Sequence, residues 1–280
     1  MVNSKENLIN SVRDINIRHD FSLDPECNFW LSDMSINPKR NDPDKVSVNL
    51  RRYHYLLWNN KQLPNGDRFL LSEATTMGDY LYFGQNTELK FGADAIINLY
   101  THHDNDKINR ILTKLKKNKK YQKRDNEYIH KSYTIGGNII FPKHNPSINT
   151  ARGNIYRIAD RIDLTLECIR IWYKDKNKET PLKSTIDIDS WFFNKFETFE
   201  NYIDFFLLQD LVVKKNGKYK IKIFLKRNAK RDSDGNVLNM YGYPTTVKEW
   251  YTLYRKELKF LKKRNRRINR YILKQHATKN

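Results

Sequence analysis

Cysteine is almost absent from this 280-residue chain, which contains only 2. Cys27 and Cys168 lie far apart in the sequence, each near apolar or aromatic neighbours. Two cysteines cannot build a disulfide framework, and they cannot complete a four-ligand zinc site without histidines. We therefore expect two reduced thiols in a cytoplasmic protein.

Long apolar runs are also missing. No stretch approaches the ~18 consecutive apolar residues that a membrane-spanning helix needs. The first residues, Met1–Glu6, are polar and do not resemble a signal peptide. We expect no membrane span and no membrane partner. Alanine and glycine are sparse whereas lysine, asparagine and isoleucine are abundant, which favours a bacterial source with an AT-rich genome.

Familiar catalytic motifs are absent as well. The chain has no P-loop, no G-x-G-x-x-G, no H-E-x-x-H and no G-x-S-x-G. It also lacks the R-x-x-x-x-H pattern of many bacterial RNase toxins. Whether the protein is an enzyme therefore stays open at this stage.

Positive charge, in contrast, is plentiful and unevenly distributed. The formal net charge is +20. Residues 213–280 carry 21 Lys and Arg against 4 Asp and Glu, and residues 101–131 carry 10 against 4, whereas the other two blocks are nearly neutral. Such asymmetry indicates a polyanionic partner, of which nucleic acid is the most common.

Aromatic residues make up 13% of the chain and supply a large core although the hydrophobic fraction is only 39%. Residues 191–213 are rich in Trp, Phe and Tyr and predict one or two core helices. Short strands broken by glycines are expected over residues 68–99. Tyr133–Phe141 predicts another strand, whose paired glycines indicate a close backbone or ligand. Asn216-Gly217 predicts a hairpin turn before a strand that ends near Leu225.

The C-terminal segment predicts a long basic helix over residues 245–276. It starts at a capping box, Thr246 to Glu249, and its apolar positions recur every three, four or seven residues. The fold class we expect is therefore α+β, with an aromatic-rich helical core packed on a small, mostly antiparallel sheet. We expect one domain over residues 1–280, made of an N-terminal segment (1–48), a body (49–244) and this helix.

Asn154–Tyr173 predicts a mostly buried helix that carries a row of carboxylates. Asp160, Asp163 and Glu167 are spaced i, i+3, i+7 and would converge on one side of it. Buried carboxylates need partners or a cation, and Mg²⁺ accepts such ligands together with phosphate oxygens. Two interpretations stay open: a structural network with arginines, or a polar catalytic site for phosphodiester cleavage.

Two further candidates flank this row. Arg152 precedes the predicted helix, where backbone N–H groups and a guanidinium could bind an anion, although Arg152 could equally pair with a carboxylate. His54 follows Arg51 and Arg52 and could act as a general base, or it could be a hydrogen-bonded, half-buried side chain. We include His54 with Asp160, Asp163 and Glu167 among the candidate catalytic residues.

Arginines dominate the candidate nucleic-acid contacts, because the guanidinium fork matches phosphate bidentately. In the C-terminal helix the run from Arg264 to Arg270 places them on several helix faces. The full set of expected contacts is Arg152, Arg161, Arg170, Arg264, Arg266, Arg267 and Arg270. The alternative is a solvated basic surface without a ligand.

Several stretches between residues 50 and 270 form a specific pattern: Leu50–His54, IGGNIIFP from Ile135, Ile148–Gly153 (INTARG), Arg157–Arg170 (RIADRIDLTLECIR), Phe205–Val212 (FFLLQDLV) and Arg264–Ile268. Over these stretches the chain resembles an uncharacterised bacterial protein family, known as a domain of unknown function. The resemblance implies a shared fold unit and no activity. It draws attention to the charged residues of the INTARG and RIADRIDLTLECIR stretches without assigning roles to them.

We therefore expect a bacterial, cytoplasmic nucleic-acid-binding protein, with RNA favoured, of the phage-defence or toxin effector type. One alternative is a metal-assisted nuclease, or another nucleic-acid-acting enzyme, that uses the Asp160, Asp163 and Glu167 row. The other is a non-enzymatic subunit whose basic segment binds an acidic protein. No cofactor is expected beyond Mg²⁺ in the nuclease alternative.

Overall fold

A computed structural model describes the protein over residues 11–27, 43–73, 80–84, 86–96, 106–143, 146–154, 157–215 and 217–277. Within them the protein is α+β, as expected: helices predominate and the strands form small antiparallel sheets. Buried apolar side chains form one continuous cluster that extends from Ile15 to Ile272. No helix in the described ranges is long and apolar enough to cross a bilayer.

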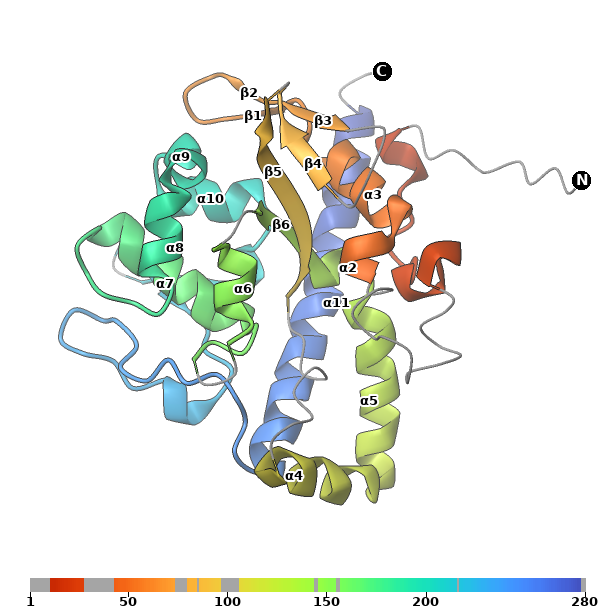
Figure 1. The fold of residues 1–280 in the computed structure, drawn as a ribbon, viewed down its shortest axis with the longest axis vertical. Coiled ribbons are helices and arrows are strands. Elements are labelled where there is room, and N and C mark those ends of the chain that lie inside the picture. The colour runs from red at the N-terminus through yellow and green to blue at the C-terminus, as the bar shows by residue number, and fades with distance from the viewer. Residues whose placement is uncertain are drawn as a thin grey trace, which may run out of the picture.

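The largest sheet has four antiparallel strands in the order β3–β4–β5–β6. They are β3 (Leu71–Glu73), β4 (Tyr80–Phe83), β5 (Asn86–Ala95) and β6 (Asn138–Pro142). Every residue of β6 is buried. In Figure 1 this sheet stands between the helices of residues 148–205, on its left, and the helix α3 (Val48–Trp58), which contacts β3, β4 and β5.

The strand expected over Tyr133–Phe141 is shorter than predicted. The chain first forms a 3-10 turn, η4 (Ile135–Gly137), and only then enters β6. The paired glycines do mark a close approach by other parts of the chain. A Cβ on Gly137 would collide with the Ser132 carbonyl, and one on Gly136 would collide with the Asn265 side chain.

Two smaller hairpins complete the strands. In one, β1 (Lys61–Gln62) pairs with β2 (Arg68–Phe69). In the other, β7 (Val212–Lys215) pairs with β8 (Lys218–Ile221) through a turn in which Gly217 has a φ of +72°, so the predicted hairpin is confirmed. The second strand stops at Ile221 and not near Leu225, because the Phe224 N–H turns inward to donate to a buried carboxylate.

The aromatic segment folds into short helices and not into one or two long ones. They are α9 (Ser190–Phe193), η5 (Asn194–Phe196), α10 (Phe199–Phe205) and η6 (Gln209–Leu211). The breaks fall at Glu197 and Leu207, whose φ angles of +60° and +56° are left-handed. Each such residue costs about 1–2 kcal/mol, which the packed rings around it offset. Phe196, for example, contacts Phe205 with ring centroids 5.0 Å apart.

The long C-terminal helix is confirmed as α11 (Val247–Ala277). The Thr246 hydroxyl accepts from the Glu249 N–H at 3.2 Å, as the predicted cap requires. The Glu249 carboxylate accepts in return from the Thr245 N–H at 2.8 Å, one residue before the expected donor, Thr246. Its apolar stripe is buried: Trp250, Leu253, Tyr254, Leu258, Leu261, Ile268 and Ile272. Figure 1 shows α11 running the length of the molecule beside α5.

The basic segment 101–131 forms two helices, α4 (Asp106–Lys116) and α5 (Lys119–Ser132), and residues 101–105 lie outside the described ranges. Asn118 separates them, and its side chain accepts from the Lys120 N–H at 3.0 Å. Both helices contact α11. The two basic segments of the sequence therefore lie against each other in the fold.

The helix expected from Asn154 begins eight residues later, as α7 (Ile162–Lys174). Ala159 and Asp160 have φ angles of +51° and +54°, which a right-handed helix excludes. A later part of the chain holds this turn, because the Gly242 N–H donates to the Arg157 carbonyl and a Cβ on Gly242 would collide with the Ile158 carbonyl. Asp160 therefore does not belong to the helix that carries Asp163 and Glu167.

Candidate functional site: buried ion pairs, a basic face and a lysine pocket

Asp163 lies in the first turn of α7 and has no exposed surface. Arg161, equally buried, donates to both of its oxygens, from Nε at 3.0 Å and from Nη2 at 2.5 Å. The Phe224 N–H adds a third hydrogen bond at 2.7 Å. Arg161 also donates to the Asn228 side chain at 2.8 Å and to the Gly242 carbonyl at 3.0 Å. This pair connects α7 to the segment between β8 and α11.

Glu167 forms a second buried pair one turn further along α7. It accepts from Arg170 Nε at 3.0 Å and Nη2 at 2.8 Å. Arg231 Nη1 donates to the same carboxylate at 2.8 Å, and the Val237 N–H donates at 3.0 Å. Arg170 continues to Asn236 Oδ1 at 2.9 Å. Glu167 therefore organises residues 231–237 against α7.

Arg152 lies at the end of α6 (Ile148–Arg152) and has no exposed surface. It pairs with Asp94 of β5, and Nε donates to Thr165 Oγ1 at 2.9 Å. Nη2 donates to the Asp160 carbonyl at 2.8 Å. Burial lowers the pKa of the Arg152 guanidinium. Its hydrogen bonds join the central sheet, α7 and the left-handed turn, and none points to solvent.

The carboxylate row thus differs from the arrangement expected on a continuous helix. Asp163 and Glu167 take different arginines and different backbone partners, and Asp160 belongs to the preceding turn. Of the two interpretations left open by the sequence, these contacts support the structural network. In the described part of the chain, no three His, Cys, Asp or Glu side chains gather as metal ligands would.

His54 is completely buried in α3. Its Nδ1 accepts from Trp58 Nε1 at 3.0 Å. Burial, together with the charge of Arg264, lowers the pKa of the imidazole to about 3. The ring is therefore neutral at physiological pH and is a weak base, whereas general bases work best with a pKa near the working pH. Its Nε2 has no hydrogen-bond partner among the described residues.

Arg264, expected to contact nucleic acid, is instead a buried structural residue. Its guanidinium donates to the carbonyls of Gly136 at 3.0 Å, Asn138 at 2.7 Å and Phe206 at 3.3 Å. Burial lowers its pKa to about 9. The adjacent Asn265 accepts from the Gly136 N–H at 2.8 Å. These two residues fasten α11 to the start of β6.

The remaining cations of α11 form an exposed surface. They lie on the helix face opposite the apolar stripe. Lys222, which follows β8, lies close enough to feel the charges of Lys259 and Lys263. We define the basic face as the exposed residues Lys222, Lys248, Arg255, Lys259, Lys263, Arg266 and Arg270. At 1.5 Å per residue the α11 members extend over roughly 33 Å. Arg266 and Arg270 are the two predicted contacts that are exposed, whereas Arg267 is half-buried and donates to Asp210 Oδ2 at 2.9 Å.

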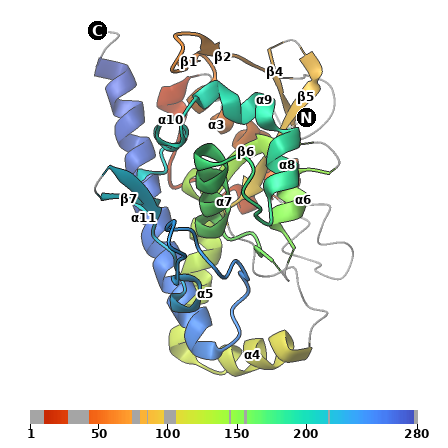
Figure 2. The ribbon, with the colours of Figure 1, turned by 90° about the vertical axis from the view of Figure 1, so that its left-hand side faces the viewer.

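Like charges on the basic face lie close together. The pKa of Lys222 is lowered by partial burial and by the nearby charges of Lys263, Arg267 and Lys259, against the opposing effect of Asp210. Figure 2 shows β7, the partner of β8, beside α11. Lys218 and Lys220 of β8, the strand that precedes Lys222, are also exposed.

A groove between α5 and α11 continues the basic face toward the start of α11. It has a volume of about 550 Å³ and is lined by Arg124, Lys248 and Arg255, together with Tyr251, Val247 and Thr252. The Arg124 guanidinium lies 5.8 Å from the centroid of the Tyr251 ring. The groove thus combines cations with a partly exposed aromatic side chain.

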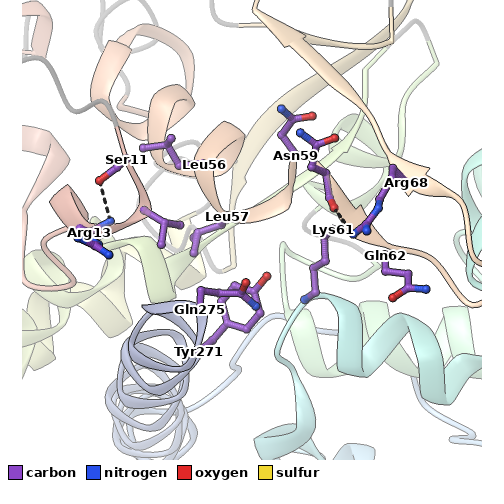
Figure 3. A pocket seen from close by; sticks show the side chains of 12 residues that line it. Ser11, Arg13, Leu56, Leu57, Asn59, Lys61, Gln62, Arg68, Tyr271 and Gln275 are labelled. Carbon is purple, nitrogen blue, oxygen red and sulfur yellow. Dashed lines mark hydrogen bonds between the residues drawn. The ribbon is translucent and has the colours of Figure 1, made fainter. Parts of the chain in front are cut away.

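A larger pocket, of about 800 Å³, lies near the other end of α11. Figure 3 shows its lining side chains, which come from η1 (Val12–Asp14), α3, the β1–β2 hairpin and the end of α11. Cations and carboxamides predominate: Arg13, Arg68, Lys61, Asn59, Asn60, Gln62 and Gln275. Leu56, Leu57 and Tyr271 add apolar surface. No carboxylate side chain lines it among the residues that the structure describes.

Lys61 is the unusual residue of this pocket. Its Nζ lies 5.1, 4.6 and 4.7 Å from the ring centroids of Trp58, Phe205 and Tyr271, and it donates to the Phe205 carbonyl. Burial lowers the pKa of its ammonium to about 7, with a weaker opposing effect of Asp204. No sequence pattern indicated this site, because two of the rings come from residues 144 and 210 positions away.

The chain belongs to a protein family of unknown function (DUF6994), whose model matches residues 15–268. This match confirms the resemblance noted in the sequence. No curated protein and no solved structure matched the chain.

Proposed function

We propose that the protein binds nucleic acid, with RNA favoured, through the basic face. The observation that carries the proposal is the concentration of exposed Lys and Arg on one side of α11 and on β8, close enough for Lys222 to experience its neighbours' charges. Like charges that lie close together repel one another and do not stabilise the folded protein, whereas a bound polyanion relieves this repulsion.

The groove at the start of α11 supports single-stranded nucleic acid as the ligand. Unpaired bases stack on aromatic side chains while cations bind the backbone, and Tyr251 with Arg124, Lys248 and Arg255 supplies both. RNA presents such unpaired bases in its loops and ends. In such a complex the bases would stack on Tyr251 and the phosphates would follow α11.

The test measures the affinity for a single-stranded RNA oligonucleotide between 50 and about 300 mM salt. Each phosphate contact contributes about −0.7 to the slope of log K against log salt for single strands. Replacing Lys259, Lys263, Arg266 and Arg270 with alanine should weaken binding and reduce the slope by up to about 3. All four side chains are exposed, so the fold should be retained.

A matched control removes four exposed lysines near the α4–α5 connection: Lys116, Lys117, Lys119 and Lys120. This variant has the same net charge as the basic-face variant. It should weaken binding less than the basic-face variant does, because these lysines belong neither to the basic face nor to the lining of the groove. Equal losses in both variants would mean that net charge, and not the basic face, determines binding.

A second variant tests the groove. Tyr251→Ala should weaken binding of single-stranded RNA by roughly 5- to 100-fold, the range for loss of one stacked base. Tyr251→Phe should bind as the wild type does, because stacking needs the ring and not the hydroxyl.

Failure of the wild type to bind RNA or DNA at about 50 mM salt would contradict the proposal. An acidic protein would then be the remaining partner for the basic face. If RNA does co-purify, sequencing it would test the effector role: phage or specific cellular transcripts would support that role, and an unselected mixture would not.

A further inference from the structure

Lys61 combines features that an ordinary surface lysine does not have. Its half-buried side chain leaves β1 and ends among three aromatic rings, in the pocket of about 800 Å³ near the end of α11. In Figure 3 it extends from the β1–β2 hairpin toward Tyr271. The pocket has the size of a small-molecule site. None of the basic-face residues lines it.

From this arrangement we infer that the pocket is a binding site for a small anionic aldehyde, which Lys61 captures covalently as an imine. The anionic preference follows from the described lining residues, which include Arg13 and Arg68 and no Asp or Glu. The carboxamides of Asn59, Asn60, Gln62 and Gln275 can donate further hydrogen bonds to oxygen atoms of the ligand. Leu56, Leu57 and Tyr271 provide apolar surface for its carbon skeleton.

The surroundings of Nζ favour its uncharged form. Three aromatic rings surround Nζ, which donates to the neutral carbonyl of Phe205. Among the described residues no carboxylate forms an ion pair with it. With its pKa lowered to about 7, about half of the amine is neutral at pH 7. An ordinary lysine, with a pKa near 10.4, is neutral in only about one molecule in two to three thousand at that pH. Desolvation is a recognised way to activate a lysine toward carbonyl compounds.

The step needs no oxidant or reductant. The lone pair of the Lys61 nitrogen attacks the aldehyde carbon, and the carbonyl oxygen takes up a proton to give a carbinolamine. The hydroxyl then leaves as water while the nitrogen loses its second proton, which forms the C=N bond. The overall change joins one amine and one aldehyde and releases one water.

Pyridoxal 5′-phosphate is a suitable probe, because it carries both an aldehyde and a phosphate. The full-length protein is incubated with it at pH 7, the imine is reduced with borohydride, and the labelled peptides are quantified by mass spectrometry. Lys61 should be labelled at least about 100-fold faster than the exposed Lys116, and its rate should level off above pH 8. Pyridoxal, which lacks the phosphate, should favour Lys61 over Lys116 at least about tenfold less than its phosphate does, because the pocket is cationic.

Two controls separate the site from general lysine chemistry. Lys61→Arg keeps a cation at this position and should abolish the selective label while leaving the labelling of Lys116 unchanged. Unfolding in urea should equalise the two lysines. The inference is overturned if native Lys61 is labelled no faster than Lys116, or if its labelling rate keeps rising to pH 10. It is also overturned if pyridoxal and its phosphate show the same preference for Lys61 over Lys116. The RNA measurements above involve different residues, so either proposal can fail alone.

Discussion

Replacing Asp163 with asparagine removes one charge from an ion pair in which neither side chain has any exposed surface. The substitution keeps the size of the side chain and one of its oxygens. It also converts the second oxygen into an N–H donor that faces the Arg161 guanidinium or the Phe224 N–H, both of which are donors. Arg161 then carries a buried positive charge beside a neutral neighbour that cannot accept both of its hydrogen bonds.

The cost can be estimated from buried ion pairs in general. Removing one partner typically destabilises a protein by about 3–5 kcal/mol, because the other charge stays in the low-dielectric interior. With a urea m-value of about 2.5 kcal/mol per molar for a chain of this size, the unfolding midpoint should fall by roughly 1–2 M.

The assay is urea denaturation of the wild type and of Asp163→Asn, followed by circular dichroism and tyrosine or tryptophan fluorescence. Asp234→Asn is the matched control, because it makes the same chemical change at an exposed side chain that lies 4.0 Å from an exposed lysine. That control should change stability by less than about 0.5 kcal/mol.

A different outcome would refute this reasoning. If Asp163 were a catalytic carboxylate in an open site, its replacement would leave stability unchanged or raise it and would abolish a nuclease activity of the wild type. A midpoint for Asp163→Asn equal to that of Asp234→Asn would therefore contradict the buried-pair argument. Divalent-dependent cleavage by the wild type that disappears in this stable variant would support the nuclease alternative.

Two further predictions test other parts of the fold. His54 takes up a proton near pH 6.5 in the unfolded chain but only near pH 3 in the folded protein, so its contribution is complete above pH 6.5 and stability falls as the pH drops toward 3. His54→Gln keeps an acceptor for Trp58 Nε1 but cannot titrate. In urea titrations, this variant should therefore lose about 3 kcal/mol less stability between pH 7 and pH 4 than the wild type does. Parallel stability profiles of the two proteins would contradict a neutral, buried His54. Gly137→Ala should prevent stable folding, because the added Cβ would collide with the Ser132 carbonyl. Gly66→Ala has open space around its Cβ but a φ of +88°, so it should cost only about 1–2 kcal/mol. Equal melting temperatures of the two variants would show that the backbone at Gly137 adapts.

Periodicity in the sequence predicted the elements whose residues repeat over several turns. The stripe from Val247 to Ile272 predicted α11, and Asn216-Gly217 predicted the hairpin that joins β7 and β8. The start of α7 could not be predicted in this way. Ala159 and Asp160 adopt left-handed φ angles without being glycine, and they do so because Gly242, more than 80 residues away, packs its backbone against Arg157 and Ile158.

The candidate site shows the same limit. Charge composition identified α11 as the basic element, but it did not separate the exposed Arg266 and Arg270 from the buried Arg264. One signal was available: Arg264 follows Leu261 by three residues and precedes Ile268 by four, which places it on the apolar stripe. The Lys61 pocket had no comparable signal, because Trp58, Phe205 and Tyr271 are brought together only by the tertiary fold.

The position of α11 also affects how the chain folds during synthesis. A ribosome makes α11 after the elements it contacts, yet Arg264 and Asn265 supply the hydrogen bonds that hold the turn before β6, and Trp250 to Ile272 cover apolar side chains contributed by α4 and α5. Until those residues emerge from the exit tunnel, the nascent polypeptide exposes a surface to which chaperones and other nascent chains can bind. Completion of this fold therefore waits for α11, and a chain truncated within the helix would expose the same apolar surface and be prone to aggregation.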